Sequence, residues 1–486
     1  MFTKKRLLYL LFALLWIGVT IIGYFGHDAI KSIYEGNASI FNRLIGGQDT
    51  IPLSVYYNAF DESYHLLLIL CVFFTLVTPG LYKLLSLESN IKQFDLKDYL
   101  LFTFLAIMFL LTASASWQGY VDNNNWRIAD WLINYQGGFV RRGLLGEVYF
   151  GLWNITGIKP GSFVFITQVL CYFIFYLFTG LLLRRQNNLL AYIVLIISPF
   201  IFTYHLHDIQ GGFRKEILYL ALFSSYVWLM LTTKPGTQKI ASILVLLIYP
   251  VLVLSHEMLA VFLPYFLMLY FYKSEYFEKK DLFYVSIYVG LSVIAFLLAL
   301  IYTGSEQHVS EICNSLKEHA AVNCESLGAI AALSESTGYG RDIVQSNIAR
   351  NDYIWKYLIC SLLALIAYIP IANRFSIISS SAAVKMLFLS TVIGTIPLFF
   401  VAVDWGRFIY IHLVSLMIVS MASPLAADAT GGITAGIKDY IQRINFGNKI
   451  IKYSLYMGVV ALLFIYALTW HIPHSGHKEI MLHYLF

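Results

Sequence analysis

Apolar runs long enough to cross a lipid bilayer recur from one end of this chain to the other. A transmembrane helix needs about 20 mostly apolar residues. Runs near that length lie at 7–25, 64–86, 98–117, 162–183, 189–204, 217–232, 240–255, 258–272, 282–302, 354–372, 384–402, 408–425 and 453–470. A segment in lipid must satisfy its own backbone hydrogen bonds, so each run is expected to be a helix. The sequence predicts an all-α, polytopic integral membrane protein, one multi-spanning domain over residues 1–486 with about thirteen transmembrane helices.

The composition excludes an ordinary soluble protein. Hydrophobic residues make up 59% of the 486 positions and charged residues only 13%, whereas soluble domains carry about 25% charged residues. We therefore expect membrane lipids around the protein and no nucleic-acid partner. The N-terminal stretch MFTKKRLLYLLFALLWIGV is basic and then apolar, like a signal peptide, but lacks a small-residue cleavage site. It is predicted to remain as the first helix.

The placement of lysine and arginine predicts which loops face the cytoplasm. With the N-terminus inside, every inward loop carries at least two basic residues, as the positive-inside rule requires. The stretch 240–272 is broken only by His256-Glu257, so it forms either a tight hairpin or one long tilted helix. The basic loop at 273–280 falls inside only if this stretch crosses twice, which favours the hairpin. The prediction is a bacterial inner-membrane protein with a cytoplasmic N-terminus and a periplasmic C-terminus.

Three outward, periplasmic segments are long: 26–63, 118–161 and 303–353. The stretch 126–135 is rich in Trp and Tyr and is predicted to lie at the membrane interface as a short helix. Cys313 and Cys324 fall in the outward segment 303–353, where an oxidising periplasm favours a disulfide. The other cysteines, Cys71, Cys171 and Cys360, lie in apolar spans and are interpreted as packing residues.

Two outward segments share the letters QGGF followed by basic residues. The first QGGF segment, residues 136–142, contains Gly137, Gly138, Arg141 and Arg142, and the second, residues 210–215, contains Gly211, Gly212, Arg214 and Lys215. Glycines let backbone N–H groups approach an anion closely, and arginine binds phosphate in a bidentate manner. The pair is interpreted as two halves of a phosphate-binding site. The alternative is that each GG makes a turn and the basic residues meet lipid headgroups.

Further charged residues interrupt or border apolar runs on the same predicted side. Asp404 and Arg407, in Asp404-Trp-Gly-Arg407, form either a structural pair or part of a site, since charges this close to lipid are costly. His256-Glu257 is either the solvated tip of a hairpin or a pair that serves as general base or binds substrate. Asp122 either caps the interfacial helix, or binds a metal ion or acts as a base. The candidate acids are Asp122, Asp208, Glu257 and Asp404, and the candidate phosphate ligands are Arg141, Arg142, Arg214, Lys215 and Arg407.

The architecture resembles two classes of envelope-glycan enzymes. A span followed by an outward acid and an interfacial helix resembles the first module of GT-C-type glycosyltransferases, which take sugars from polyprenyl-phosphate carriers. In that group the acid follows the first helix, whereas Asp122 follows the third run. The many outward spans with arginines placed for a lipid pyrophosphate also resemble O-antigen and capsule repeat-unit polymerases. Each resemblance covers architecture along most of the chain. Residues 138–146 and 404–407 resemble segments of other bacterial envelope proteins.

These resemblances imply a transferase that works on undecaprenyl phosphate- or pyrophosphate-linked sugars in O-antigen, lipopolysaccharide, capsule or other envelope glycan synthesis. Basic residues would stabilise the phosphate leaving group, and an acid would deprotonate the attacking hydroxyl. No redox cofactor is required, no metal ligand is assigned, and a divalent metal ion is compatible with the chemistry. Other glycan-assembly membrane proteins are candidate partners. The alternative function is a transporter or flippase of lipid-linked sugars.

Overall fold

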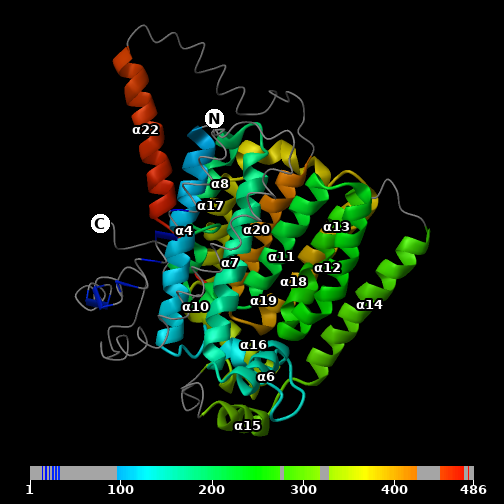
Figure 1. Ribbon diagram of the computed structural model, residues 1–486. Helices are drawn as coiled ribbons and strands as arrows, with labels where there is room; N and C mark the ends of the chain where they lie inside the picture. Colours follow the sequence, from blue (N-terminus) through cyan, green and yellow to red (C-terminus); the bar gives the residue numbers. More distant parts are fainter. Residues whose placement is uncertain are drawn as a thin grey trace.

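The computed structural model describes residues 96–273, 279–317, 328–423 and 449–475, residue 480, and scattered positions between 14 and 32. The regular elements from residue 96 onward are helices, as Figure 1 shows, and the all-α prediction is confirmed for this part of the chain. They are α4 (Leu96–Val121), α5 (Ala129–Leu132), α6 (Leu144–Thr156), α7 (Pro160–Arg184), η1 (Leu189–Tyr192), α8 (Ile193–Ile197), α9 (Tyr204–His207), α10 (Ile209–Gly212), α11 (Glu216–Thr232), α12 (Pro235–Ser255), η2 (Glu257–Phe262), α13 (Leu263–Lys273), α14 (Lys279–Ile301), α15 (Glu306–Leu316), η3 (Ala331–Leu333), α16 (Thr337–Arg350), α17 (Tyr353–Ile366), η4 (Ile369–Ile377), α18 (Ala382–Thr395), α19 (Leu398–Val401), α20 (Trp405–Ala422) and α22 (Lys449–Leu468).

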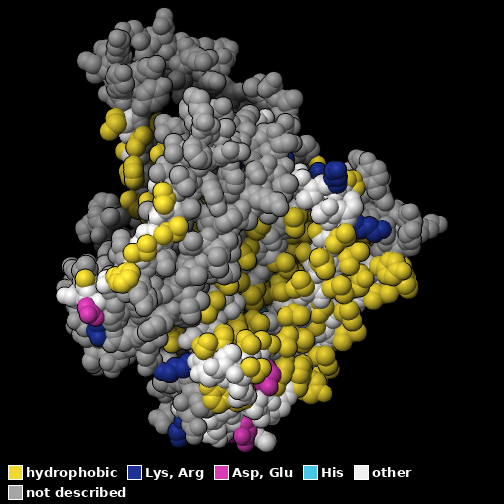
Figure 2. Space-filling model, in the orientation of Figure 1, with side chains coloured by type: hydrophobic (Ala, Val, Ile, Leu, Met, Phe, Trp, Pro, Cys, Tyr) yellow, Lys and Arg dark blue, Asp and Glu magenta, His cyan; other side chains and the backbone are white. Residues whose placement is uncertain are grey.

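Six helices in the described part are long and apolar enough to cross a membrane, and a bent pair would make seven. The protein is therefore a multi-pass membrane protein. The prediction of about thirteen spans reaches beyond these residues, because 64–86 and almost all of 7–25 lie outside the described part. Figure 2 shows a broad hydrophobic surface on the side of the bundle where α14 lies, with charged side chains near its two ends. That distribution is typical of a surface that faces lipid.

The centre of the bundle is α7, which packs between α4 and α11. The α4–α7 contact is close, because a Cβ added at Gly180 would lie 2.6 Å from Leu105 Cδ1. Lipid tails are as apolar as these side chains, so helices in a membrane associate through close packing and interhelical hydrogen bonds. Ser116 supplies one such bond by donating to Gln168 Oε1 over 2.7 Å.

The stretch 240–272 is a hairpin, as the distribution of basic residues predicted. Helix α12 ends at Ser255, and His256 is extended, with φ −159° and ψ 111°. The chain then turns back through η2 and α13, so that the rings of Tyr249 and Phe266 pack with centroids 5.3 Å apart. The Tyr249 hydroxyl also donates to Leu259 O over 2.6 Å, which holds the two arms of the hairpin together.

Three local expectations are wrong. Residues 189–204 form η1, α8 and turns instead of one helix; because α7 and α11 both begin at the same end of the bundle, the chain returns to that end through broken helices. The run 354–372 is bent by 84° between α17 and η4. Residues 126–135 contain only the single helical turn α5, whose residues are buried. It lies inside the protein instead of at an interface, and the Trp131 indole N–H donates to Phe213 O over 3.0 Å.

The described residues of segments 118–161 and 303–353, which were predicted to face outward, cover one end of the bundle with short helices. Helices α6, α15 and α16 gather at this end, which is the lower end in Figure 1. The helices α4, α12 and α14 end here, and α7, α11 and α20 begin here. This alternation agrees with the predicted topology. Lys97, Arg184, Lys234 and Lys273 lie at the opposite ends of α4, α7, α12 and α13.

Cys313 on α15 is disulfide-bonded. Its predicted partner, Cys324, lies outside the described residues. Cys171 and Cys360 are free and buried, which agrees with their interpretation as packing residues. Cys71 lies outside the described residues.

Candidate functional site

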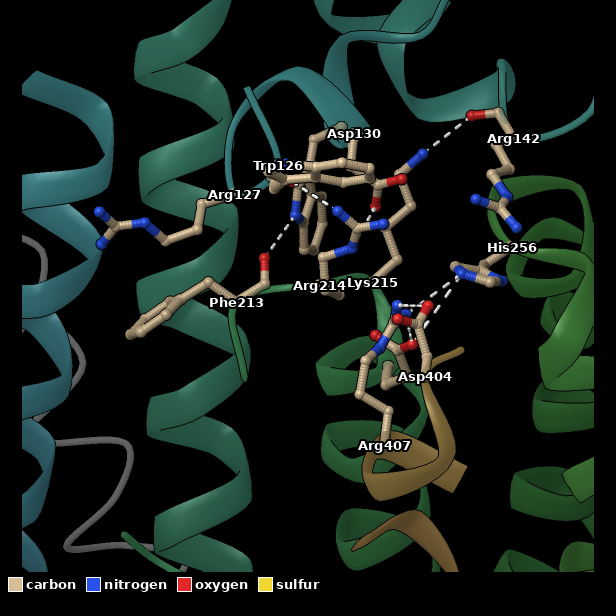
Figure 3. A network of polar contacts seen from close by, with 12 residues as sticks. Trp126, Arg127, Asp130, Arg142, Phe213, Arg214, Lys215, His256, Asp404 and Arg407 are labelled. Carbon is tan, nitrogen blue, oxygen red and sulfur yellow. Dashed lines mark hydrogen bonds and ion pairs between the residues drawn. The ribbon is translucent and has the colours of Figure 1, made fainter. Parts of the chain in front are cut away.

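Most of the charged residues singled out from the sequence meet in one ion-pair network at the lower end of the bundle (Figure 3). They come from the loop after α5, the loop before α11, the tip of the α12 hairpin and the start of α20. The ion-pair network comprises Asp130, Arg141, Arg142, Arg214, Lys215, Glu216, His256, Glu257, Asp404 and Arg407. Separate segments of the chain thus bring these charged residues together in the structure.

The first QGGF segment is an irregular turn that presents two arginines. Gly138 has a φ of +107°, a conformation that glycine adopts without strain, and Arg142 has a φ of +68°. The turn is held by Glu147, which accepts hydrogen bonds from Tyr135 N (2.9 Å) and Gln136 Nε2 (3.0 Å). The main-chain N–H of Arg141 donates to Tyr302 O at the end of α14 over 2.8 Å. These bonds direct the two arginines toward the hairpin tip.

Glu257 at the hairpin tip binds both arginines of the first segment. Arg142 donates from Nε to the two carboxylate oxygens at 3.1 and 2.9 Å and from Nη2 at 2.5 Å. Arg141 Nη1 lies 3.9 Å from the same carboxylate. Burial alone would raise the pKa of Glu257, but Arg142 outweighs it and the pKa lies well below its usual range. The side chains of Arg141 and Arg142 are 19% and 21% exposed, so this end of the network reaches the surface.

The second QGGF segment is a short buried helix. The Asp208 carboxylate caps α10 by accepting a hydrogen bond from Gly211 N over 3.1 Å. A Cβ at Gly212 would lie 2.3 Å from the His205 Cα, so only glycine fits there. The hydroxyl of Tyr172 on α7 donates to Gly212 O over 2.6 Å, which anchors the segment to the centre of the bundle.

The basic pair of the second segment points into the network. Arg214 lies over the Trp126 ring at 5.2 Å and donates to Trp126 O over 3.0 Å. Lys215 Nζ donates to Arg142 O over 2.9 Å, which joins the two QGGF segments directly. The Lys215 side chain is fully buried, and burial lowers its pKa from 10.5 to about 8. This pair therefore lies beneath the arginines of the first segment.

Asp130 is the carboxylate on which this buried pair depends. Its side chain is fully buried, and its oxygens accept no hydrogen bond from the described residues. The nearest charge is Arg214 Nε at 3.8 Å. Burial raises the pKa of Asp130, but Arg214 and then Lys215 outweigh burial, and the pKa lies below its usual range. The sequence analysis did not include Asp130 among the site residues, although it precedes the first QGGF segment.

Two carboxylates, those of Asp404 and Glu216, bind Arg407. Its Nη1 donates to Asp404 Oδ2 over 2.7 Å and its Nη2 donates to Glu216 Oε1. His256 Nε2 lies 3.4 Å from Arg407 Nη2 and 3.9 Å from Glu216 Oε1. Burial and Arg142 lower the pKa of His256 to about 3, so its imidazole is neutral at neutral pH. Glu216 was also missed as a site residue; a buried arginine requires such a counter-ion.

Two candidate acids lie apart from the network. The carboxylate of Asp122 accepts from Gln118 Nε2 over 2.9 Å and lies 3.6 Å from Arg127 Nη2. Asn124, instead of Asp122, caps the following turn by accepting from Trp126 N and Arg127 N. Asp208 pairs with His474, a residue that the sequence analysis did not single out. In the described part of the chain, no three His, Cys, Asp or Glu side chains form a group suited to a metal ion.

The charges within the network do not balance. The cations are Arg141, Arg142, Arg214, Lys215 and Arg407, against the carboxylates Asp130, Glu216, Glu257 and Asp404. One cation is therefore in excess while His256 is neutral. Each QGGF segment has two cations that share one carboxylate, Glu257 in the first segment and Asp130 in the second, whereas Arg407 has two carboxylates. The first of these pairs, Arg141 and Arg142, is the one that reaches the surface.

Searches of protein-family models, curated proteins and solved structures find no match to this chain.

Proposed function

We propose that this protein is an integral membrane glycosyltransferase or repeat-unit polymerase that acts on lipid-linked sugars at the periplasmic face of a bacterial inner membrane. The observation that carries the proposal is the network with one cation in excess, in which Arg141 and Arg142 share a single carboxylate and reach the surface. A phosphate or pyrophosphate group on an undecaprenyl carrier is the anion that such a site would bind. The product would be an envelope glycan such as O-antigen or capsule.

Arg141 and Arg142 are the residues proposed to hold the phosphate. A guanidinium group offers a planar fork that matches phosphate oxygens. Arg141 is only loosely paired, at 3.9 Å from Glu257, so it can turn to a phosphate without leaving a buried carboxylate unpaired. Below these two arginines the network is buried, and Arg214, Lys215 and Arg407 there hold the exposed end of the network in place. In the reaction the two arginines would stabilise the phosphate leaving group as its charge develops.

The transfer reaction also requires a base that deprotonates the attacking hydroxyl. Glu257 is bound by two arginines and has a lowered pKa, so it is a weak base. Asp404 pairs with Arg407 and Asp122 lies near Arg127. Asp208 is the remaining acid of the candidate set, and it contacts an accessible histidine. The reaction requires no redox cofactor, and a divalent metal ion stays compatible with it.

A transporter or flippase of lipid-linked sugars is the second candidate function. The buried Lys215, whose pKa is lowered to about 8, favours it, because ionisable groups inside a bundle often mark transport pathways. The charges of this network gather at one end of the helices instead of near the middle of a bilayer, which favours the enzyme.

The test is sugar transfer by purified protein with an undecaprenyl-linked glycan in detergent. Arg141→Lys is expected to lower the rate about tenfold to a hundredfold, because it removes one charge-assisted contact worth about 1.5–3 kcal/mol. Arg341→Lys is the matched control, since Arg341 on α16 is 63% exposed and pairs only with its neighbour Asp342. Wild-type protein that transfers no sugar, yet moves the lipid-linked glycan across proteoliposome membranes, would establish the transporter instead.

A further inference from the structure

A segment close to the C-terminus runs along the ion-pair network. Gly406 N donates to His474 O over 3.4 Å, and the Tyr357 hydroxyl donates to Pro473 O over 3.0 Å. The contact is tight, because a Cβ at Gly406 would lie 1.7 Å from Pro473 O. The segment therefore sits against the start of α20, one residue from Arg407.

The carboxylate of Asp208 makes two hydrogen bonds with His474. The main-chain N–H of His474 donates to Asp208 Oδ2 over 2.7 Å, and His474 Nδ1 lies 2.6 Å from Asp208 Oδ1. Gly211 N also donates to Oδ1, so both carboxylate oxygens act as acceptors. A carboxylate cannot donate, so Nδ1 carries the proton, and Nε2 is left with its lone pair when the ring is neutral.

The side chain of His474 is partly exposed. It is 15% exposed while Asp208 is fully buried, and Nε2 makes no hydrogen bond within the described part of the chain. Other histidines of the bundle differ. His205 Nε2 contacts Thr112 Oγ1 at 2.6 Å, and both ring nitrogens of His412 are engaged by Tyr265 and Thr395.

We infer that His474 is the general base of the proposed transfer reaction and that Asp208 positions its imidazole. This inference rests on the proposed function. His474 Nε2 would take the proton of the acceptor hydroxyl as that oxygen forms a bond to the anomeric carbon of the donor sugar. The bond from that carbon to the phosphate oxygen breaks, its electron pair stays on the phosphate, and the imidazolium then loses its proton to water. Asp208 holds the ring and stabilises the imidazolium.

The test measures kcat and KM for the lipid-linked glycan with purified full-length protein. His474→Gln is expected to lower kcat about 10²- to 10⁴-fold with KM unchanged, and imidazole in the buffer is expected to restore transfer by His474→Ala. Asp208→Asn should also lower kcat, without rescue by imidazole. His471→Gln is the matched control, because it removes an imidazole from the same segment and should keep transfer.

The outcomes separate this inference from the proposed function. Wild-type protein that transfers no sugar overturns the proposed function and the inference with it. Wild-type protein that transfers sugar, together with His474→Gln at the wild-type rate, overturns only the inference. Loss of transfer in His474→Ala without rescue, at an unchanged thermal midpoint, also overturns it, because the lost group would then not be a base.

Discussion

The two QGGF segments have the same four letters but different structures. The first is an irregular turn whose Gly138 has a φ of +107°, and its arginines are about one-fifth exposed. The second is the short helix α10, capped by Asp208, and it is followed by Arg214 and Lys215, which are buried. The same motif therefore forms the partly exposed end of the network in one place and its buried interior in the other.

The difference between the two lies in their counter-ions. The first pair shares the partly exposed Glu257, whereas Arg214 and Lys215 share the fully buried Asp130. A buried charge that loses its partner is strongly destabilising, and an exposed one is not. The second segment should therefore govern folding, and the first should govern ligand binding. Three predictions test this division.

The largest effect is expected from Asp130→Asn, which leaves Arg214 and Lys215 buried without their carboxylate. The free energy of unfolding should fall by about 3–5 kcal/mol, measured by denaturation in detergent. The matched change at the exposed end, Arg141→Gln, should alter it by less than about 0.5 kcal/mol. Equal losses for the two variants would contradict the division.

A smaller effect is expected from packing at the glycines. A Cβ at Gly212 would meet the His205 backbone at 2.3 Å, whereas at Gly137 it would lie 3.0 Å from Glu311 Cβ. Gly212→Ala should lower the thermal midpoint more, at a cost of about 1–3 kcal/mol. Gly151→Ala is the control, since nothing lies within 4 Å of a Cβ there. A larger loss for Gly137→Ala than for Gly212→Ala would show that the first segment is the tighter one.

The effect that is smallest per pH unit is a pH dependence expected from Lys215 of the second segment. The pKa of Lys215 is about 8 in the folded protein and 10.5 when unperturbed. Between these values the unfolded chain binds more protons, so stability rises with pH, by at most about 1.4 kcal/mol per pH unit. Lys215→Met should remove this rise from pH 8 to 10.5 in denaturation curves. Identical slopes for the variant and the wild type would mean that Lys215 is not buried as a cation.

Sequence reasoning was accurate where one physical requirement acts on a contiguous run. Most long apolar runs in the described part became helices, because lipid forces a segment to satisfy its own backbone. The basic residues at 273–280 correctly predicted a hairpin instead of a single long helix. The run 189–204, which lies largely inside the protein, forms broken helices instead. The run 354–372 exposes apolar side chains such as Leu362 and still bends by 84°. Apolar composition does not distinguish such runs from those that stay one helix.

The candidate site likewise has a part that the sequence predicted and a part that it did not. The sequence by itself predicted that charged residues bordering apolar runs would lie at one face, because a charge cannot remain in lipid unpaired. Of the predicted residues, Arg141, Arg142, Arg214, Glu257, Asp404 and Arg407 meet in the network, and Asp122 and Asp208 lie apart from it. Only the tertiary structure decided which arginine is exposed and which carboxylate each one binds. Asp130, Glu216 and His474 acquire their partners across separations such as the 266 residues between Asp208 and His474. Pairing over such distances depends on how the helices pack, and no local pattern of residues records it.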